Sequence, residues 1–341
     1  MKEKYIANKN KEIKKKLEKP FKGGKNPFVY SSSKVSKLKR IVIPSLEGLY
    51  LDKLNFVSIS LPKIHPMTFQ KNEEEYPHEK IICMYDRDFS DMLLDQFKKS
   101  LDCAINDFKA NIICINELGM PINKKGEVRE DAILYARKMA NENNCLIIAG
   151  SNHSSKTYLN IGYIFFPGVD LLGNDYRKFY KNISAVGVGE KLFTPSERII
   201  YYTKAFGIGI SFLICLEIAD FSSSCTIVRR NESIDFLIVP TYLTDFGTMD
   251  KVSKSLSTAL GGVLLSNCHN HKDLPDSRMY LHGNLHKDNQ KEYTLKVIDD
   301  KTTVILRTVD MKKFGINKTK MALNLPEDLQ FLFGPEMCEI G

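Results

Sequence analysis

The chain has 341 residues, enough for one large domain or two small ones with a substantial buried core. Its 43% hydrophobic and 26% charged residues are ordinary for a globular protein. No apolar stretch approaches the roughly 20 residues that a membrane-spanning helix needs. The N-terminus also lacks the apolar core of a signal peptide, so we expect a cytoplasmic protein with no membrane segment.

The net charge of +8 is concentrated near the N-terminus, where residues 1–40 are rich in lysine. Such a segment is typical of a solvated, partly disordered extension. The alternative is a basic arm that binds nucleic acid or an acidic protein partner. No interleaved aromatic residues or RNA-binding signature supports that alternative. We place a Lys-rich extension at 1–50, the main domain at 51–325 and a C-terminal tail at 326–341.

From residue 55 onward, strand-like and helix-like segments alternate without a break in composition, which favours a single α/β domain. The polar insert at 63–85 reads as a surface loop. The eight cysteines include no CxxC pair, and several lie within apolar runs, so we expect reduced, mostly buried thiols. Strands are expected at 56–61, 111–116, 145–149, 160–166, 207–215, 234–239, 263–266, 293–298 and 303–309, and helices at 88–109, 131–143, 218–228 and 252–260.

Three residues with complementary chemistry lie at or beside the polar ends of apolar segments. Cys215 sits where an apolar strand gives way to a predicted helix, whose free N–H groups would lower the pKa of its thiol. Glu117 follows a buried strand and is a candidate base, and Lys178 lies in a basic stretch flanked by aromatic residues. Taken singly, each has an ordinary reading: a core cysteine, a loop glutamate and a surface lysine. Together they would make a nucleophile with its own base and its own cation, suited to attack on a carbonyl or nitrile carbon.

The surroundings of these residues resemble the nitrilase superfamily of carbon–nitrogen hydrolases across roughly residues 55–311. Shorter markers in the same order agree, such as Gly150-Ser151 after a strand and Leu265-Ser266-Asn267 at the end of a late strand. The three main segments are Ile115-Asn116-Glu117-Leu118, similar to the family's "PEL", Asp175-Tyr176-Arg177-Lys178-Phe179, similar to "YRK", and Phe212-Leu213-Ile214-Cys215-Leu216-Glu217, similar to "ICYD/E".

The resemblance implies a four-layer αββα sandwich that commonly dimerises, or forms a higher homo-oligomer, and needs no cofactor. It makes Cys215 the nucleophile, Glu117 the general base and Lys178 the cation at the tetrahedral intermediate. Glu190 would help to position the site, and the backbone N–H of Leu216 would be a further oxyanion donor. The implied reaction is hydrolysis of a small-molecule amide, in preference to a nitrile, through a cysteine thioester.

Some positions depart from the family pattern, and two other classes of function stay open. Asn116 stands where a proline is usual, and Thr241-Tyr242 displaces an aromatic residue that faces the substrate in the family. One alternative is a nitrilase-like module without catalysis, or regulated by a partner, which docks to a nucleic acid or a protein through its basic head. Another is a metal site formed by Cys268 and its neighbouring histidines (His269, His271, His282 and His286), although their spacing matches no zinc motif.

Overall fold

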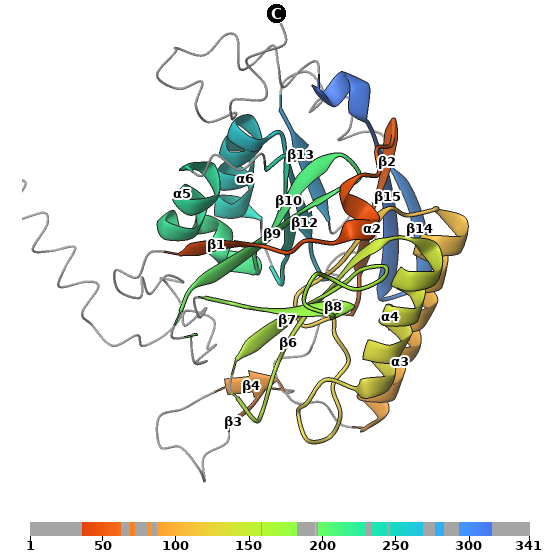
Figure 1. Ribbon diagram of the computed structural model, residues 1–341. Coiled ribbons are helices and arrows are strands. Elements are labelled where there is room, and N and C mark those ends of the chain that lie inside the picture. Colours follow the sequence, from red (N-terminus) through yellow and green to blue (C-terminus); the bar gives the residue numbers. More distant parts are fainter. Residues whose placement is uncertain are drawn as a thin grey trace, which may run out of the picture.

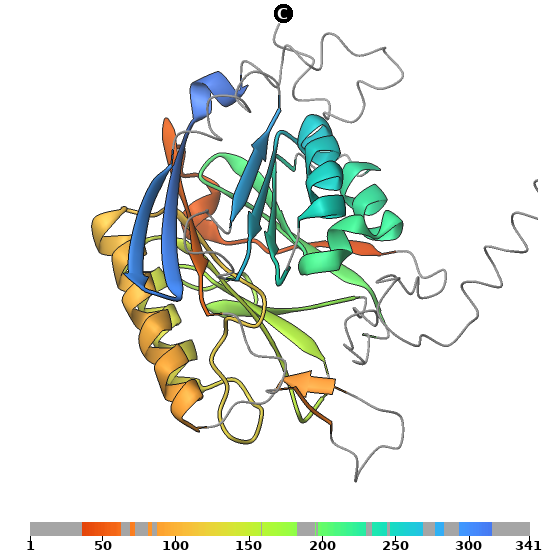
Figure 2. The ribbon, with the colours of Figure 1, turned by 180° about the vertical axis from the view of Figure 1, so that it is seen from behind.

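The described chain forms two large β-sheets that pack face to face, with helices on both outer surfaces (Figure 1; Figure 2). The two sheets and the two helical layers make the expected αββα sandwich. The computed structural model describes residues 36–62, 69–71, 81–83, 87–157, 159–182, 195, 197–229, 234–243, 246–268, 277–282 and 293–315.

Seven strands form one sheet, which is covered on its outer face by α3 (Arg87–Asp102) and α4 (Glu130–Asn143) (Figure 1). A π-helical turn, Cys103–Asp107, continues α3. The strand order is β14 (Thr294–Asp299), β15 (Thr302–Asp310), β2 (Lys53–Ser60), β5 (Ile112–Ile115), β6 (Leu146–His153), β7 (Asn160–Phe165) and β8 (Tyr176–Tyr180).

Six strands form the other sheet, which is covered by α5 (Phe221–Arg229) and α6 (Gly247–Leu260) (Figure 2). Among the described residues, no helix is both long enough and apolar enough to cross a bilayer. The strand order is β1 (Lys37–Arg40), β9 (Ile199–Ala205), β10 (Ile208–Phe212), β11 (Phe236–Pro240), β12 (Gly262–Ser266) and β13 (Arg278–Leu281).

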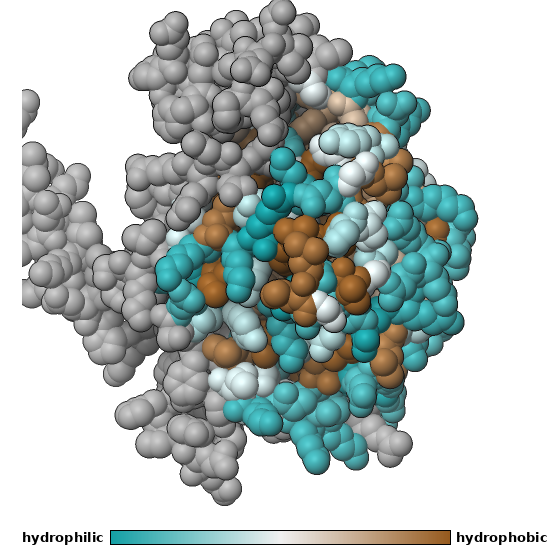
Figure 3. Space-filling view, in the orientation of Figure 1, coloured by the Kyte–Doolittle hydropathy of each residue, from teal (hydrophilic) through white to brown (hydrophobic). Residues whose placement is uncertain are grey.

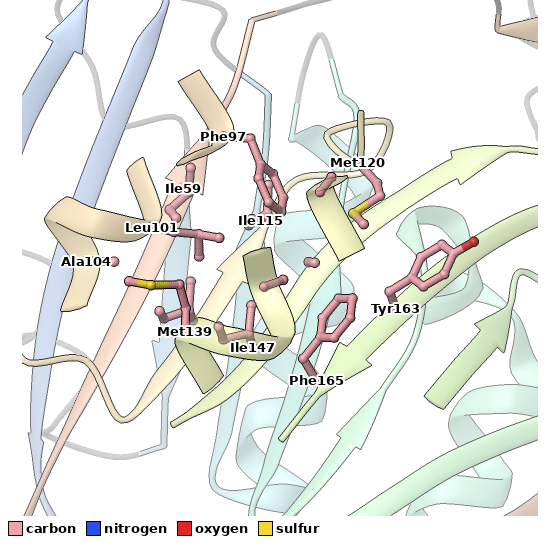
Figure 4. Close-up of a cluster of buried hydrophobic side chains, with 14 of the residues drawn as sticks. Ile59, Phe97, Leu101, Ala104, Ile115, Met120, Met139, Ile147, Tyr163 and Phe165 are labelled. Atoms are coloured by element: carbon pink, nitrogen blue, oxygen red, sulfur yellow. The ribbon is translucent and has the colours of Figure 1, made fainter. Parts of the chain in front are cut away.

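The central strands are apolar throughout because both of their faces are buried. In β5, Ile113 and Ile115 point toward α3 and α4, while Ile112 and Cys114 point toward the other sheet. Figure 4 shows the outer layer, where Phe97 and Leu101 of α3 pack close to Ile115. Side chains alternate between the two faces of a strand, so a strand covered on both faces reads as a continuous apolar run.

Both sheets send the C-terminal ends of their parallel strands to one edge of the sandwich. Strands β2, β5 and β6 are parallel to one another, as are β10, β11 and β12. The two edges meet directly, since Ser266 Oγ donates to the carbonyl oxygen of Cys114 at 2.9 Å. Residues that follow β5 in one sheet and β11 in the other are therefore brought together.

The N-terminal boundary of the domain lies earlier than the predicted residue 50. Strand β1 pairs in parallel with β9, and the short helix α2 (Pro44–Glu47) follows it. The side chains of Ile43 and Leu46 are wholly buried among inter-sheet residues. Part of the predicted extension therefore belongs to the sandwich, because its apolar residues close the core. Residues 1–35 and the predicted tail at 326–341 lie outside the described residues.

Two surface features complete the described fold. The predicted loop at 63–85 contains a small antiparallel pair, β3 (Phe69–Lys71) with β4 (Ile81–Cys83). The face in Figure 3 carries hydrophobic side chains among hydrophilic ones. In the turn after β7, Leu171 and Leu172 expose 71% and 72% of their surface. Exposed apolar side chains are what an oligomer interface buries, and the homo-oligomer stays a prediction.

Candidate active site

Cys215 lies on a strained elbow three residues beyond the end of β10. Its backbone has φ 51°, a left-handed value that costs a non-glycine residue energy. A short 3-10 turn, Cys215–Ala219, follows, and α5 begins only at Phe221. A 3-10 turn therefore begins at the thiol in place of the predicted α-helix, which starts only after it. Only 3% of Cys215 is exposed, and it packs among residues between the two sheets.

Glu117 is held at the edge of the other sheet by backbone and amide contacts. Asn116 Oδ1 accepts the N–H of Leu61 at 2.8 Å, and its Nδ2 donates to the carbonyl of Glu117 at 2.7 Å. Gly150 lies beneath this turn, where a Cβ atom would stand 2.2 Å from the Asn116 carbonyl oxygen. Asn116 therefore anchors the turn by side-chain hydrogen bonds, and the Glu117 side chain is 4% exposed.

The lysine that meets Glu117 is Lys181 and not the predicted Lys178. Lys181 Nζ lies 2.7 Å from Glu117 Oε1, and both side chains are nearly inaccessible to solvent. Lys178 is exposed, and its Nζ stands 5.7 Å from the centre of the Tyr163 ring. The reason is strand alternation, because Phe179 faces the inter-sheet core and places Lys178 on the opposite face. The same two-residue alternation, continued one residue past β8, puts Lys181 on the side of Phe179. The alternation could have been read from the sequence.

Asn160 is a second residue at Glu117 that motif reasoning did not assign to the site. Its Nδ2 donates to Glu117 Oε1 at 2.8 Å, the same oxygen that Lys181 contacts. The backbone N–H of Lys181 also donates to the Asn160 carbonyl at 3.0 Å. Two donors on one oxygen hold the carboxylate in place beside the thiol of Cys215, which also hydrogen-bonds to Glu117.

Glu217 ties the cysteine elbow to the strand end that carries Lys181. Its Oε1 accepts the backbone N–H and the Nδ2–H of Asn182, at 2.6 and 2.7 Å. Its Oε2 accepts the N–H of Ile214 at 2.7 Å. Burial raises the pKa of the Glu217 carboxyl to about 7, against the lowering effect of these donors and of the charge on Lys181. The carboxyl thus bridges the residues next to the nucleophile and the lysine.

The Cys215 thiol is neutral before substrate binds, and it is hydrogen-bonded to the carboxylate of Glu117. Burial raises the pKa of the thiol well above its ordinary value, and the negative charge of Glu117 raises it further. Lys181 and the backbone N–H of Tyr242 act in the opposite direction. Such a thiol becomes a nucleophile as its proton passes to the neighbouring carboxylate.

The remaining predicted site residues stand as follows. Leu216 comes directly after the nucleophile in the 3-10 turn, whereas Glu190 lies outside the described residues. Cys268 and His282 are buried, and His269, His271 and His286 also lie outside the described residues. Within the described ranges no three His, Cys, Asp or Glu side chains are grouped so that they could hold a metal ion.

Comparison with solved structures places this sandwich in the nitrilase fold. Saccharomyces cerevisiae Nit3, a member of branch 10 of the nitrilase superfamily, superposes with a TM-score of 0.55 at 12% identity. That match covers 83% of this chain and 98% of Nit3. A carbon–nitrogen hydrolase from Helicobacter pylori G27 gives the same TM-score at 13% identity, over 81% of this chain and 96% of its own.

A third solved structure, an amidase variant from Nesterenkonia AN1, has a TM-score of 0.50 at 11% identity and covers 77% of this chain and 92% of its own. No protein-family model matches the sequence, and no curated protein matches it either. The likeness is one of three-dimensional fold.

Proposed function

We propose that the chain hydrolyses a non-peptide carbon–nitrogen bond of a small amide, with a nitrile as the second choice of substrate. The observation that carries the proposal is the buried cluster of Cys215, Glu117 and Lys181, in which the carboxylate contacts both the thiol and the ammonium. A nucleophile, a base and a cation within hydrogen-bond reach are the parts that acyl transfer through a thioester requires.

In the first half of the reaction, Cys215 Sγ attacks the carbonyl carbon while its proton passes to Glu117. Negative charge then develops on the carbonyl oxygen, within reach of Lys181 Nζ and the backbone N–H of Leu216. Glu117 returns the proton to the departing nitrogen as the carbon–nitrogen bond breaks. Ammonia or an amine leaves, and the acyl group stays on Cys215 as a thioester.

In the second half, water replaces the departed amine. Glu117 takes a proton from the water, whose oxygen attacks the thioester carbon and forms a second tetrahedral intermediate. The carbon–sulfur bond breaks, the carboxylic acid is released and the thiol of Cys215 regains its proton from Glu117. The carboxylate therefore acts as a base in both halves of the reaction, and its ion pair with Lys181 holds it in position.

The test is to separate acylation at Cys215 from any other route to product. The chain would be screened against short amides and nitriles, and intact-mass spectrometry would look for the acyl adduct on Cys215. We expect Cys215→Ala to abolish both turnover and adduct, whereas Cys103→Ala, which removes another buried thiol in the turn after α3, should retain both. Turnover that survives in Cys215→Ala removes this cysteine from the mechanism.

A further inference from the structure

The segment 241–243, directly beyond β11, touches both the base and the nucleophile. The Thr241 carbonyl oxygen accepts the backbone N–H of Glu117 at 3.2 Å. The next peptide N–H, that of Tyr242, donates to the sulfur of Cys215. The backbone of 241–243 therefore fixes the position of the Glu117 backbone and also supplies a hydrogen bond to Cys215 Sγ.

Asn267, just past the end of β12, holds this segment in place. Its Oδ1 accepts the N–H of Leu243 at 2.7 Å and the hydroxyl of Thr241 at 3.2 Å. Its Nδ2 donates to the Leu243 carbonyl oxygen at 3.0 Å. The side chain of Asn267 is wholly buried, so water cannot replace these bonds without opening the core.

These contacts continue the sheet where the strands themselves have ended. Thr241 N–H still bonds to the Ser266 carbonyl at 2.7 Å, as in a strand ladder. At Leu243 the amide group of Asn267 supplies one acceptor and one donor, the two bonds that a neighbouring strand would offer to a residue's backbone. Tyr242 lies between these two fixed residues, so its N–H has little freedom to turn away from Cys215.

We propose that Asn267 is a positioning residue, which sets the geometry of the Cys215–Glu117 pair through the backbone of 241–243. This inference deepens the proposed function and rests on the same site. The charged groups that act on the thiol are Glu117, from the end of β5, and Lys181, from beyond β8. Asn267 contacts neither, so its effect reaches the sulfur through the N–H of Tyr242.

The decisive measurement is the pH dependence of Cys215 alkylation by iodoacetamide in the full chain, read at the Cys215 peptide by mass spectrometry. Asn267→Leu keeps the side-chain size and removes all three hydrogen bonds. Loss of the Tyr242 N–H from the sulfur should move the alkylation profile to higher pH. A change of about one unit lowers the alkylation rate below the midpoint roughly tenfold.

Two further variants keep the test decisive. Thr241→Val removes the hydroxyl, which contacts Asn267 Oδ1 and also the Ser266 carbonyl oxygen at 3.1 Å, but keeps both bonds between Asn267 and Leu243. It should move the profile in the same direction by a smaller amount. It decides the question if Asn267→Leu does not fold, and an unmoved profile in Thr241→Val then overturns the inference. Asn55→Leu is the matched control, because Asn55 Nδ2 donates to the carbonyls of Phe108 and Lys109 near the start of β2, at the opposite end of that strand from the site.

A purely structural role predicts a different pattern. In that case Asn267→Leu lowers the unfolding midpoint and leaves the alkylation profile of the folded protein unchanged, which overturns the inference. An equal shift in Asn55→Leu overturns it as well. Alkylation needs no turnover, so failure to find an amide substrate contradicts the proposed function alone, and an unmoved profile contradicts the role of Asn267 alone.

Discussion

Replacing Lys181 by methionine, with Lys178→Met as its matched control, tests which lysine serves the site. Lys181 forms a 2.7 Å ion pair with Glu117 inside the protein, whereas Lys178 lies exposed over the ring of Tyr163. The two substitutions remove the same charge and add the same side chain, three residues apart. Any difference between them comes from the position of the ammonium group.

The expected magnitudes follow from burial. Removing one partner of a buried ion pair typically costs about 3–5 kcal/mol, because the other charge is left uncompensated. Removing a donor from the developing oxyanion costs roughly 100- to 1000-fold in kcat. Lys181→Met should therefore lose both stability and turnover, whereas Lys178→Met, as a surface change, should keep kcat within about twofold.

The assay combines urea unfolding with steady-state kinetics on an amide that the wild-type chain hydrolyses. The double variant Glu117→Gln with Lys181→Met removes both charges, so it should recover much of the lost stability without recovering turnover. If Lys178→Met loses activity and Lys181→Met keeps it, the assignment of Lys181 is refuted. If the double variant is no more stable than Lys181→Met, the reasoning about the uncompensated charge is wrong.

The pKa of Glu217, raised from 4.5 to about 7, predicts that folding stability falls as pH rises through that interval, because the folded chain keeps a proton that the unfolded chain has released. The free energy of unfolding, measured in urea at about pH 5 and about pH 8, should decline by about 3 kcal/mol in the wild-type chain and not in Glu217→Gln. An equal decline in the two proteins would contradict the raised pKa. Deleting 1–35 should leave the unfolding midpoint unchanged, whereas deleting 1–47 removes β1 and α2 and should lower it; equal midpoints would show that β1 and α2 add no stability. Gly150→Ala and Gly173→Ala both impose a left-handed backbone on alanine, at roughly 1–2 kcal/mol, but only the Gly150 Cβ meets a backbone atom, so Gly150→Ala should lose more stability and also turnover. Equal losses in the two variants would mean that the turn at Asn116 relaxes.

Apolar periodicity alone predicted many of the strands and helices and a single α/β domain, whereas the four-layer αββα arrangement was expected from the family resemblance. Segments such as 111–116 and 234–239 are continuous apolar runs of strand length, and they form β5 and β11 close to the predicted bounds. The strands that were missed, β1, β3, β4, β8, β9 and β13, are short or carry polar side chains. Their positions depend on pairing with distant neighbours, as β1 does with β9, and such pairing leaves no local pattern.

The candidate site likewise contains residues that the sequence predicted and residues that only the three-dimensional structure revealed. Cys215 and Glu117 were predicted because each lies at or just beyond the polar end of a buried strand, where parallel strands of an α/β sheet collect their functional groups. The prediction of Lys178 was wrong because it rested on the basic motif at 176–178. The alternation of side chains along the strand places Lys181, and not Lys178, on the same side as Phe179. Asn160 and Asn267 carry no chemical signature of their own, and their contacts show their roles only in three dimensions.

The sequence by itself determined the class of fold, the two strand ends that bear the thiol and the carboxylate, and the type of cation that completes them. These follow from local apolar patterns and from residue chemistry, which a single segment contains. The tertiary structure alone decided that Lys181 meets Glu117, that Glu217 ties the two strand ends together and that Asn267 supports the backbone beside the sulfur. Each of these contacts joins segments at least 24 residues apart in the chain. The order of strands within a sheet brings Lys181 to Glu117 and Asn267 to Leu243, whereas the packing of the two sheets brings Glu217 to Asn182.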